Sequence, residues 1–131
     1  MTVLGPIEPN TVGNTTTHDH IIIDFNAVLT DPIDSKDISK MDEKISIDNL
    51  GWVRFNWASS RDNLKYDDVE DACNELNHYR NSGGKTIVDV TNIGLGRDAQ
   101  KLKEISSKTG INIVMGSGFY VELAQRKNYT S

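Results

Sequence analysis

Two histidines separated by one residue are the part of this chain whose types and spacing best suit chemistry. His18 and His20 flank Asp19 within the run 15–25, whose β-branched residues favour a strand. Because strand side chains alternate between two faces, both imidazoles are expected to point the same way and Asp19 the opposite way. Neutral imidazoles are ligands of zinc and related divalent metals. The spacing therefore predicts a metal-binding pair, although histidines also pair in this way by chance on surfaces and in cores.

The residues that follow the pair favour a buried setting. Ile21, Ile22 and Ile23 form an apolar run without alternation, which is typical of a strand buried on both faces in a parallel sheet. Two imidazoles in such a strand need polar partners, since a buried polar group without one is costly. A bound metal ion would supply those partners and strengthens the prediction for His18 and His20.

Strands and helices are expected to alternate along the rest of the chain, which predicts an α/β fold with parallel strands. The stretch 26–44 is polar and has no period, so it indicates a long surface loop. Aspartate is a favoured helix N-cap and glycine a frequent helix stop. The expected elements are a helix over 47–57, a helix from the cap Asp67 to Gly83, a strand over 85–91, a helix from the cap Asp98 to Gly110, and a strand over 111–115.

Composition excludes several classes of partner. The chain has 131 residues, enough for one domain, and a net charge of −5, which argues against a basic surface for nucleic acid. No stretch approaches the roughly 20 apolar residues of a membrane span. The single Cys73 cannot form an internal disulfide, and the first residues lack the pattern of a secretory signal. We therefore expect a cytoplasmic protein without a membrane or nucleic-acid partner.

Three blocks in chain order resemble the phosphotriesterase family of the amidohydrolase superfamily, and most closely its phosphotriesterase-related and lactonase-like members. The first block joins 2–7 to the Thr-His-Asp-His of 17–20, which is similar to the family's first barrel strand. The second block, 84–98, resembles the family's second strand and its G-x-x-R-D loop. The third, 109–121, resembles its third strand. Together the blocks span nearly the whole chain.

This resemblance implies the N-terminal portion of a (β/α)8 barrel. A complete barrel takes about 250 residues, so residues 1–131 are expected to form a single incomplete domain with about three of the eight strands. By resemblance, His18 and His20 ligate the more buried of two divalent metals, expected to be zinc. A bridging carboxylated lysine or glutamate, two further histidines and a catalytic aspartate belong to strands four, five, six and eight, so we expect no catalytic residue within 1–131.

The activity implied by the resemblance is hydrolysis of a small-molecule substrate. The family's members are metal-dependent hydrolases of ester, lactone, phosphoester or amide bonds, in which a metal-bound hydroxide attacks the substrate. We expect a zinc-dependent hydrolase with a catabolic role, inactive as 131 residues alone. An alternative is a non-catalytic truncated isoform that associates, with like chains or others, through the open edge of its third strand. A third interpretation is an incomplete gene product.

Five further residues have two interpretations each. By resemblance, Tyr120 faces the substrate pocket, and the alternative is packing at the barrel rim. Arg97 and Asp98 could contact an anionic substrate. The alternative, which is favoured, is that Asp98 caps the helix while Arg97 braces the loop. Asp89 is either a buried polar contact or a residue of the barrel interior. His78 follows the apolar stripe of a helix and is interpreted as a surface or packing residue.

Overall fold

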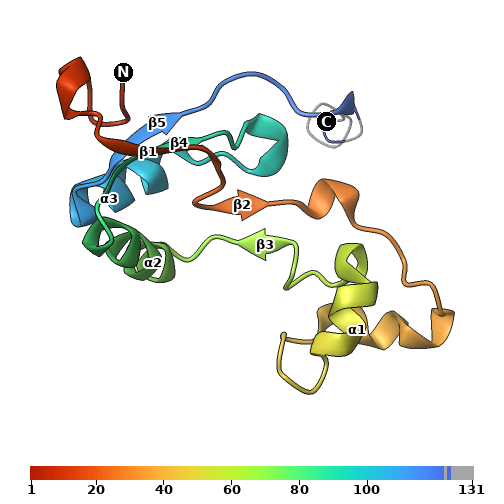
Figure 1. Ribbon diagram of the computed structural model, residues 1–131. Helices are drawn as coiled ribbons and strands as arrows, with labels where there is room; N and C mark the ends of the chain where they lie inside the picture. Colours follow the sequence, from red (N-terminus) through yellow and green to blue (C-terminus); the bar gives the residue numbers. More distant parts are fainter. Residues whose placement is uncertain (123, 125–131) are drawn as a thin grey trace.

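Three parallel strands lie side by side in the larger part of the molecule (Figure 1), in the order β1-β4-β5. The structure is a computed structural model that describes residues 1–122 and 124. The strands of this sheet are β1 (Asn14–Asp19), β4 (Gly84–Asp89) and β5 (Asn112–Met115). Parallel strands need crossover connections, and helices complete both of them here. The predicted α/β alternation is confirmed.

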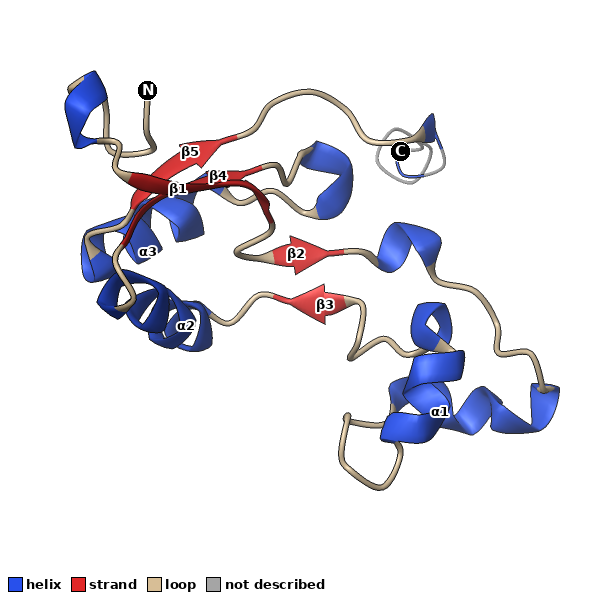
Figure 2. Cartoon of the chain, in the orientation of Figure 1, coloured by secondary structure: helices blue, strands red, loops and turns tan. Residues whose placement is uncertain are grey.

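Two helices cover one face of this sheet (Figure 2). They are α2 (Val69–Asn81) and α3 (Ala99–Thr109), which also pack against each other. Their apolar stripes, predicted from helical spacing, form the core with the strands. The buried apolar residues of this core are Ile21, Ile22, Ala72, Cys73, Leu76, Ile87, Leu102, Ile105, Ile111 and Ile113.

Aspartate side chains cap both helices, one of them at a different residue from the prediction. Asp98 accepts hydrogen bonds from the amides of Gln100 and Lys101, as predicted. On α2 the cap is Asp68, which accepts from the amides of Glu70 and Asp71, so the predicted cap Asp67 is wrong. The Asp67 carboxylate instead pairs with Lys65 at 3.0 Å and with Lys101 at 3.4 Å. Two adjacent aspartates offer equivalent caps, and these lysines decide between them.

Replacing Asp98 by alanine is expected to lower the free energy of unfolding by about 1 kcal/mol, because two amides of the first helical turn lose their acceptor. Asp98→Asn is the matched control, since its side-chain oxygen still accepts. Urea unfolding followed by circular dichroism measures both variants. Equal losses for the two would contradict a capping role.

The first strand is shorter than predicted, and the chain bends sharply after it. β1 ends at Asp19, and the buried Ile21 and Ile22 lie in the bend rather than in a doubly buried strand. Ile23 then begins β2 (Ile23–Asp24), which pairs antiparallel with β3 (Lys65–Tyr66). The apolar run predicts a doubly buried strand, but Ile21 and Ile22 are buried by packing into the core from the bend. No local pattern distinguishes these two causes of an apolar run.

Beyond β2 and β3 the chain forms a smaller lobe at the far end of this two-stranded stalk (Figure 1). The helix predicted over 47–57 is confined to α1 (Leu50–Phe55). The stretch 26–44, predicted as a loop, contains two 3-10 helices. Trp52 Nε1 donates to Asp37 at 2.7 Å and so joins α1 to the longer of them. The 3-10 helices of the described chain are η1 (Pro9–Thr11), η2 (Asn26–Val28), η3 (Ser35–Asp42), η4 (Trp57–Ser59) and η5 (Ile93–Leu95).

Within residues 1–122 and 124, none of the helices has both the length and the apolar character needed to cross a membrane.

Candidate metal centre

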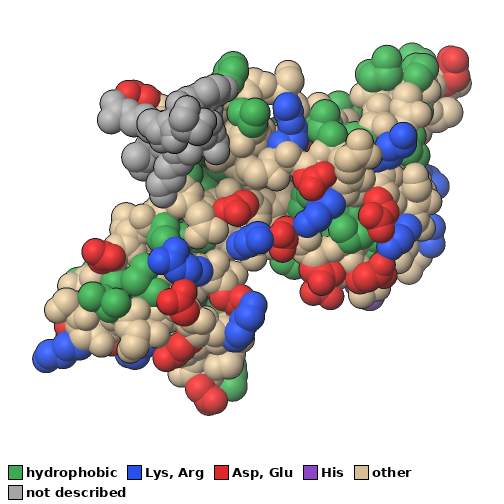
Figure 3. Space-filling view, turned by 180° about the vertical axis from the view of Figure 1, so that it is seen from behind, with side chains coloured by type: hydrophobic (Ala, Val, Ile, Leu, Met, Phe, Trp, Pro, Cys, Tyr) green, Lys and Arg blue, Asp and Glu red, His purple; other side chains and the backbone are tan. Residues whose placement is uncertain are grey.

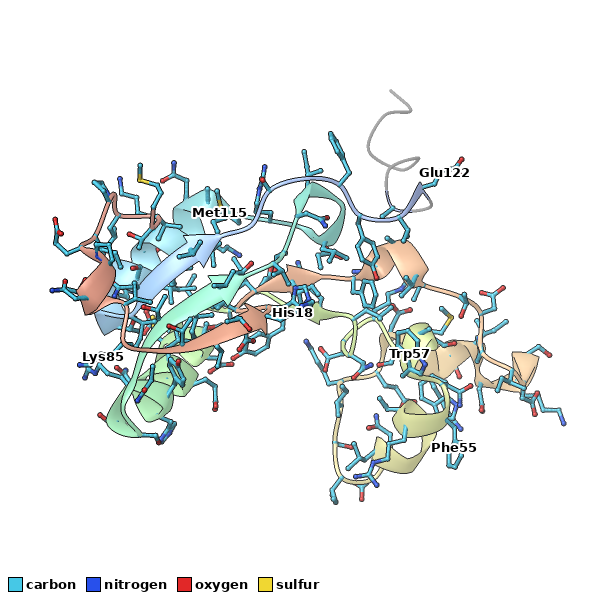
Figure 4. All side chains as sticks on the ribbon, turned by 45° about the horizontal axis from the view of Figure 1, so that its top comes forward. His18, Phe55, Trp57, Lys85, Met115 and Glu122 are labelled. Atoms are coloured by element: carbon cyan, nitrogen blue, oxygen red, sulfur yellow. The ribbon has the colours of Figure 1, made fainter. Side chains whose placement is uncertain are left out.

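The two histidines lie together where β1 ends (Figure 4 labels His18). His18 is the second-last residue of β1, and His20 follows the strand directly. Their ring centroids are 5.8 Å apart with planes 78° to each other. The register between β1 and β4 shifts between Thr16 and Asp19, and such irregularities re-aim side chains near functional sites. The predicted proximity of the imidazoles is confirmed, with His18 exposed and His20 half-buried.

His20 is held by a threonine from the neighbouring strand's end. Its Nδ1 lies 2.9 Å from the hydroxyl oxygen of Thr91, two residues past β4. The backbone amide of His20 donates to the Asp19 carboxylate at 2.9 Å. Thr91 is fully buried and also donates its hydroxyl to the carbonyl of Ile22 at 3.3 Å. The ring and backbone of His20 are therefore both fixed by polar contacts.

Asp89 is a brace between the ends of β1 and β4. Its side chain is 0% exposed, and its two carboxylate oxygens accept from the amides of Ile21 and Thr91, both at 2.9 Å. A carboxylate buried this deeply is stable only when it is hydrogen-bonded. Of the two roles open from the sequence, Asp89 is the buried polar contact, and it secures the bend that carries His20.

The histidines border a cavity of about 460 Å³ at the end of the sheet. Because the strands are parallel, the ends of β1 and β4 meet at one edge, which is where α/β folds place their sites. The cavity wall is mainly apolar and aromatic. Its remaining lining residues are Ile23, Phe25, Val90, Asn92, Leu95 and Tyr120.

Tyr120 belongs to an aromatic row that runs along this cavity into the smaller lobe. It meets Phe25 edge to face at 5.8 Å between centroids, and Phe25 stacks on Trp57 at 6.3 Å. Tyr120 thus lines the cavity and packs at its rim at once. Sequence reasoning missed Phe25 and Trp57 as neighbours of the site, because nothing local shows that they lie beside Tyr120, which follows β5.

The loop after β4 contains bracing contacts rather than a free charge. Arg97 donates through Nη1 to the carbonyl of Gly116 at 3.2 Å, and the Gly116 amide donates to the carbonyl of Asp89. A Cβ on Gly116 would lie 2.9 Å from that same carbonyl oxygen, so this close approach requires glycine. The structural interpretation of Arg97 and Asp98 is confirmed.

The two imidazoles fit half of a zinc site. Zinc takes four ligands in a tetrahedron, and neutral histidine nitrogen is among its preferred donors. In the part of the chain that the structure describes, no group of three or more His, Cys, Asp or Glu side chains is placed to hold a metal. His78 is exposed on α2, as predicted, and lies apart from the pair. Further ligands would have to come from outside the described residues.

Comparisons with known proteins agree on one family. A sequence model of the phosphotriesterase family matches residues 1–130. The N-acetyltaurine hydrolase of Rattus norvegicus is 37% identical over 122 residues, which is 92% of this chain and 35% of that protein. The chain thus spans about a third of the length of the curated relatives it matches.

Solved structures of relatives show the same arrangement of elements. A resiniferatoxin-binding protein from Rhodobacter sphaeroides has a TM-score of 0.89 at 35% identity, over 95% of this chain and 35% of that one. A lactonase from Listeria monocytogenes has a TM-score of 0.64 at 27% identity, over 94% of this chain and 29% of that one. These neighbours are barrels, so the parallel strands described above correspond to the N-terminal portion of a (β/α)8 barrel. The chain belongs to the phosphotriesterase family.

Proposed function

We propose that this protein is the N-terminal part of a zinc-dependent hydrolase and that His18 and His20 are ligands of its metal. The observation that carries the proposal is the convergence of the two imidazoles on the cavity where the parallel strands end. Residues 1–131 form, in this proposal, one incomplete domain. The family membership supports a hydrolase with a binuclear metal centre, and a catabolic role is part of the same proposal.

Each side chain at the cavity has a task in this proposal. A divalent metal bound there supplies Lewis-acid polarisation of the scissile group and activation of water. His18 and His20 hold that metal through neutral ring nitrogens. Tyr120 and Phe25 form the apolar wall against which the substrate lies. Catalytic acid or base groups are not proposed among residues 1–131.

The substrate proposed is a small molecule with an ester, lactone, phosphoester or amide bond. Relatives include proteins named N-acetyltaurine hydrolase and lactonase, whose substrates carry an amide and a cyclic ester. Thiol chemistry is not proposed, because burial raises the pKa of the Cys73 thiol and keeps it in its unreactive form. The free, buried state of this single cysteine supports a cytoplasmic location.

Charge gives no support for a nucleic-acid partner. On the face shown in Figure 3, Lys and Arg side chains are interspersed with Asp and Glu rather than gathered in a basic stripe. The net charge of the chain is −5. A phosphate backbone is bound by clustered positive charge, so a small molecule remains the proposed ligand.

A chimaera tests the proposed function. Residues 1–122 of this chain would replace the matching segment of the rat N-acetyltaurine hydrolase. We expect zinc-dependent release of taurine from N-acetyltaurine, lost when His18 and His20 are both changed to alanine. His78→Ala is the matched control, because it removes the third histidine away from the site. Equal activity in the double variant and the unchanged chimaera would refute the proposal.

The 131 residues alone are expected to show no zinc-dependent turnover of N-acetyltaurine, a lactone or a phosphotriester. Two imidazoles leave the tetrahedral zinc set half empty. Product release would be followed by chromatography with and without added zinc. Turnover that is abolished by His18→Ala would contradict this expectation.

Association through the edge of β5 is the second candidate role. β5 pairs with β4 on one side only among the described strands, which leaves an edge for another strand. That edge is partly used, since the amide of Val3 donates to the carbonyl of Ile113 at 2.8 Å. Sedimentation of a clean monomer over a wide concentration range would count against self-association at this edge.

A further inference from the structure

The hydroxyl of Thr91 lies between the ring of His20 and a backbone carbonyl. Its oxygen is 2.9 Å from His20 Nδ1 and 3.3 Å from the carbonyl oxygen of Ile22. Thr91 is fully buried, so water does not compete for these contacts. Both partners come from the bend after β1, whereas Thr91 follows β4.

These contacts determine which nitrogen of His20 carries the proton. A carbonyl oxygen can only accept, so the single hydroxyl proton of Thr91 is directed to Ile22. The hydroxyl oxygen must then accept from Nδ1–H of His20. A neutral imidazole has one N–H, which leaves the lone pair of Nε2 free for a metal.

His18 has no comparable support. Among the residues that the structure describes, the side chain of His18 contacts the ring of His20 and makes no hydrogen bond. It is exposed, whereas His20 is half-buried. The two histidines are therefore unequal, with a fixed ring at His20 and a freer one at His18.

The threonine is itself fixed by a buried charge. The Asp89 carboxylate accepts from the Thr91 amide and from the Ile21 amide, both at 2.9 Å. Asp89 thus sets the distance between the segment that carries the hydroxyl and the segment that carries the ring. Outer contacts of this kind set the orientation and tautomer of metal-ligating histidines.

We propose that Thr91 is a positioning residue that presents His20 to a divalent metal through Nε2, with Asp89 as its brace. The inference rests on the proposed function for the metal. The tautomer of the metal-free protein is a separate property, and it can be measured whether or not zinc binds.

Nitrogen-15 NMR of the metal-free chain at about pH 8, where an ordinary imidazole is neutral, tests the inference. We expect His20 to carry its proton on Nδ1 in the unchanged chain and in Thr91→Ser. In Thr91→Val, which keeps the shape and removes the hydroxyl, both tautomers should appear. A His20 protonated on Nε2 in the unchanged chain, or a tautomer unaffected by Thr91→Val, would overturn the inference.

Thr86→Val is the matched control for packing. Thr86 is also buried, lies on β4, and donates its hydroxyl to the carbonyl of Val12 at 2.6 Å. It touches neither histidine in the described contacts. We expect it to alter stability without altering the His20 tautomer. If Thr91→Val fails to fold, a His20 protonated on Nε2 in the unchanged chain or in Thr91→Ser still overturns the inference.

Zinc titration by calorimetry separates this inference from the proposed function. Loss of an outer contact weakens metal binding by about 10- to 100-fold, and we expect this loss for Thr91→Val and not for Thr91→Ser. An unchanged chain that binds no zinc but has the expected tautomers would refute the metal site and support only the control of the His20 tautomer by Thr91. Zinc binding that is equal in Thr91→Val and the unchanged chain would overturn the positioning role alone.

Discussion

Replacing Asp89 by alanine is expected to lower the free energy of unfolding by about 3 kcal/mol, because two buried amide donors lose a charged acceptor. The amides are those of Ile21 and Thr91, and neither donates to any other acceptor among the described residues. The bend after β1 would lose its attachment to β4. Urea unfolding followed by tryptophan fluorescence and circular dichroism gives the measurement.

Two variants make this result specific to the brace. Asp48 is exposed on the smaller lobe, and Asp48→Ala is expected to change the free energy of unfolding by less than about 0.5 kcal/mol. Asp89→Asn keeps one acceptor oxygen but turns an amide donor toward the second backbone amide, so it should also destabilise. A free energy of unfolding for Asp89→Ala within about 0.5 kcal/mol of the unchanged chain would show that Asp89 is no brace.

Changing His18 and His20 together to alanine is expected to abolish the tightest zinc-binding step of the chain. Both imidazoles are the proposed ligands, and their rings are close enough to share one ion. Calorimetric titration with zinc measures the step. His78→Ala should leave it unchanged, because His78 is exposed on α2 away from the pair.

The single variant His18→Ala separates a role as metal ligand from a role in stabilising the fold. Exposed residues without buried partners change stability by about 0.5 kcal/mol or less, so His18→Ala should unfold at nearly the same urea concentration as the unchanged chain. Zinc affinity that persists in the double variant, or falls equally in His78→Ala, would place the metal elsewhere.

The elements with strong periodicity could be predicted from the sequence. The stripes of α2 and α3 repeat at helical spacing, and the Asp98 cap is a local signal, so the alternation of helix and strand follows from short stretches. The pairing of His18 with His20 is equally local, since it depends only on the alternation of one strand. These parts of the fold and site need no knowledge of distant contacts.

The features that the sequence does not predict depend on contacts between residues far apart in the chain. The bend after Asp19 is secured by Asp89, which lies 70 residues later in the sequence and is the partner of Asp19 in the β1–β4 register. The cap of α2 shifted to Asp68 because the Asp67 carboxylate pairs with two lysines, one of them on α3. Phe25 lines the cavity directly after β2, which pairs with the distant β3, and its amide donates to the carbonyl of Leu64. Local patterns cannot report any of these.

X-ray absorption at the zinc edge tests the central claim most directly. With one equivalent of zinc bound to the chain, we expect two imidazole nitrogens in the zinc shell at about 2.0–2.1 Å. Both should disappear when His18 and His20 are changed to alanine and remain in His78→Ala. A shell of oxygen ligands alone in the unchanged chain would contradict the assignment of this pair as the metal-holding part of a phosphotriesterase-family site.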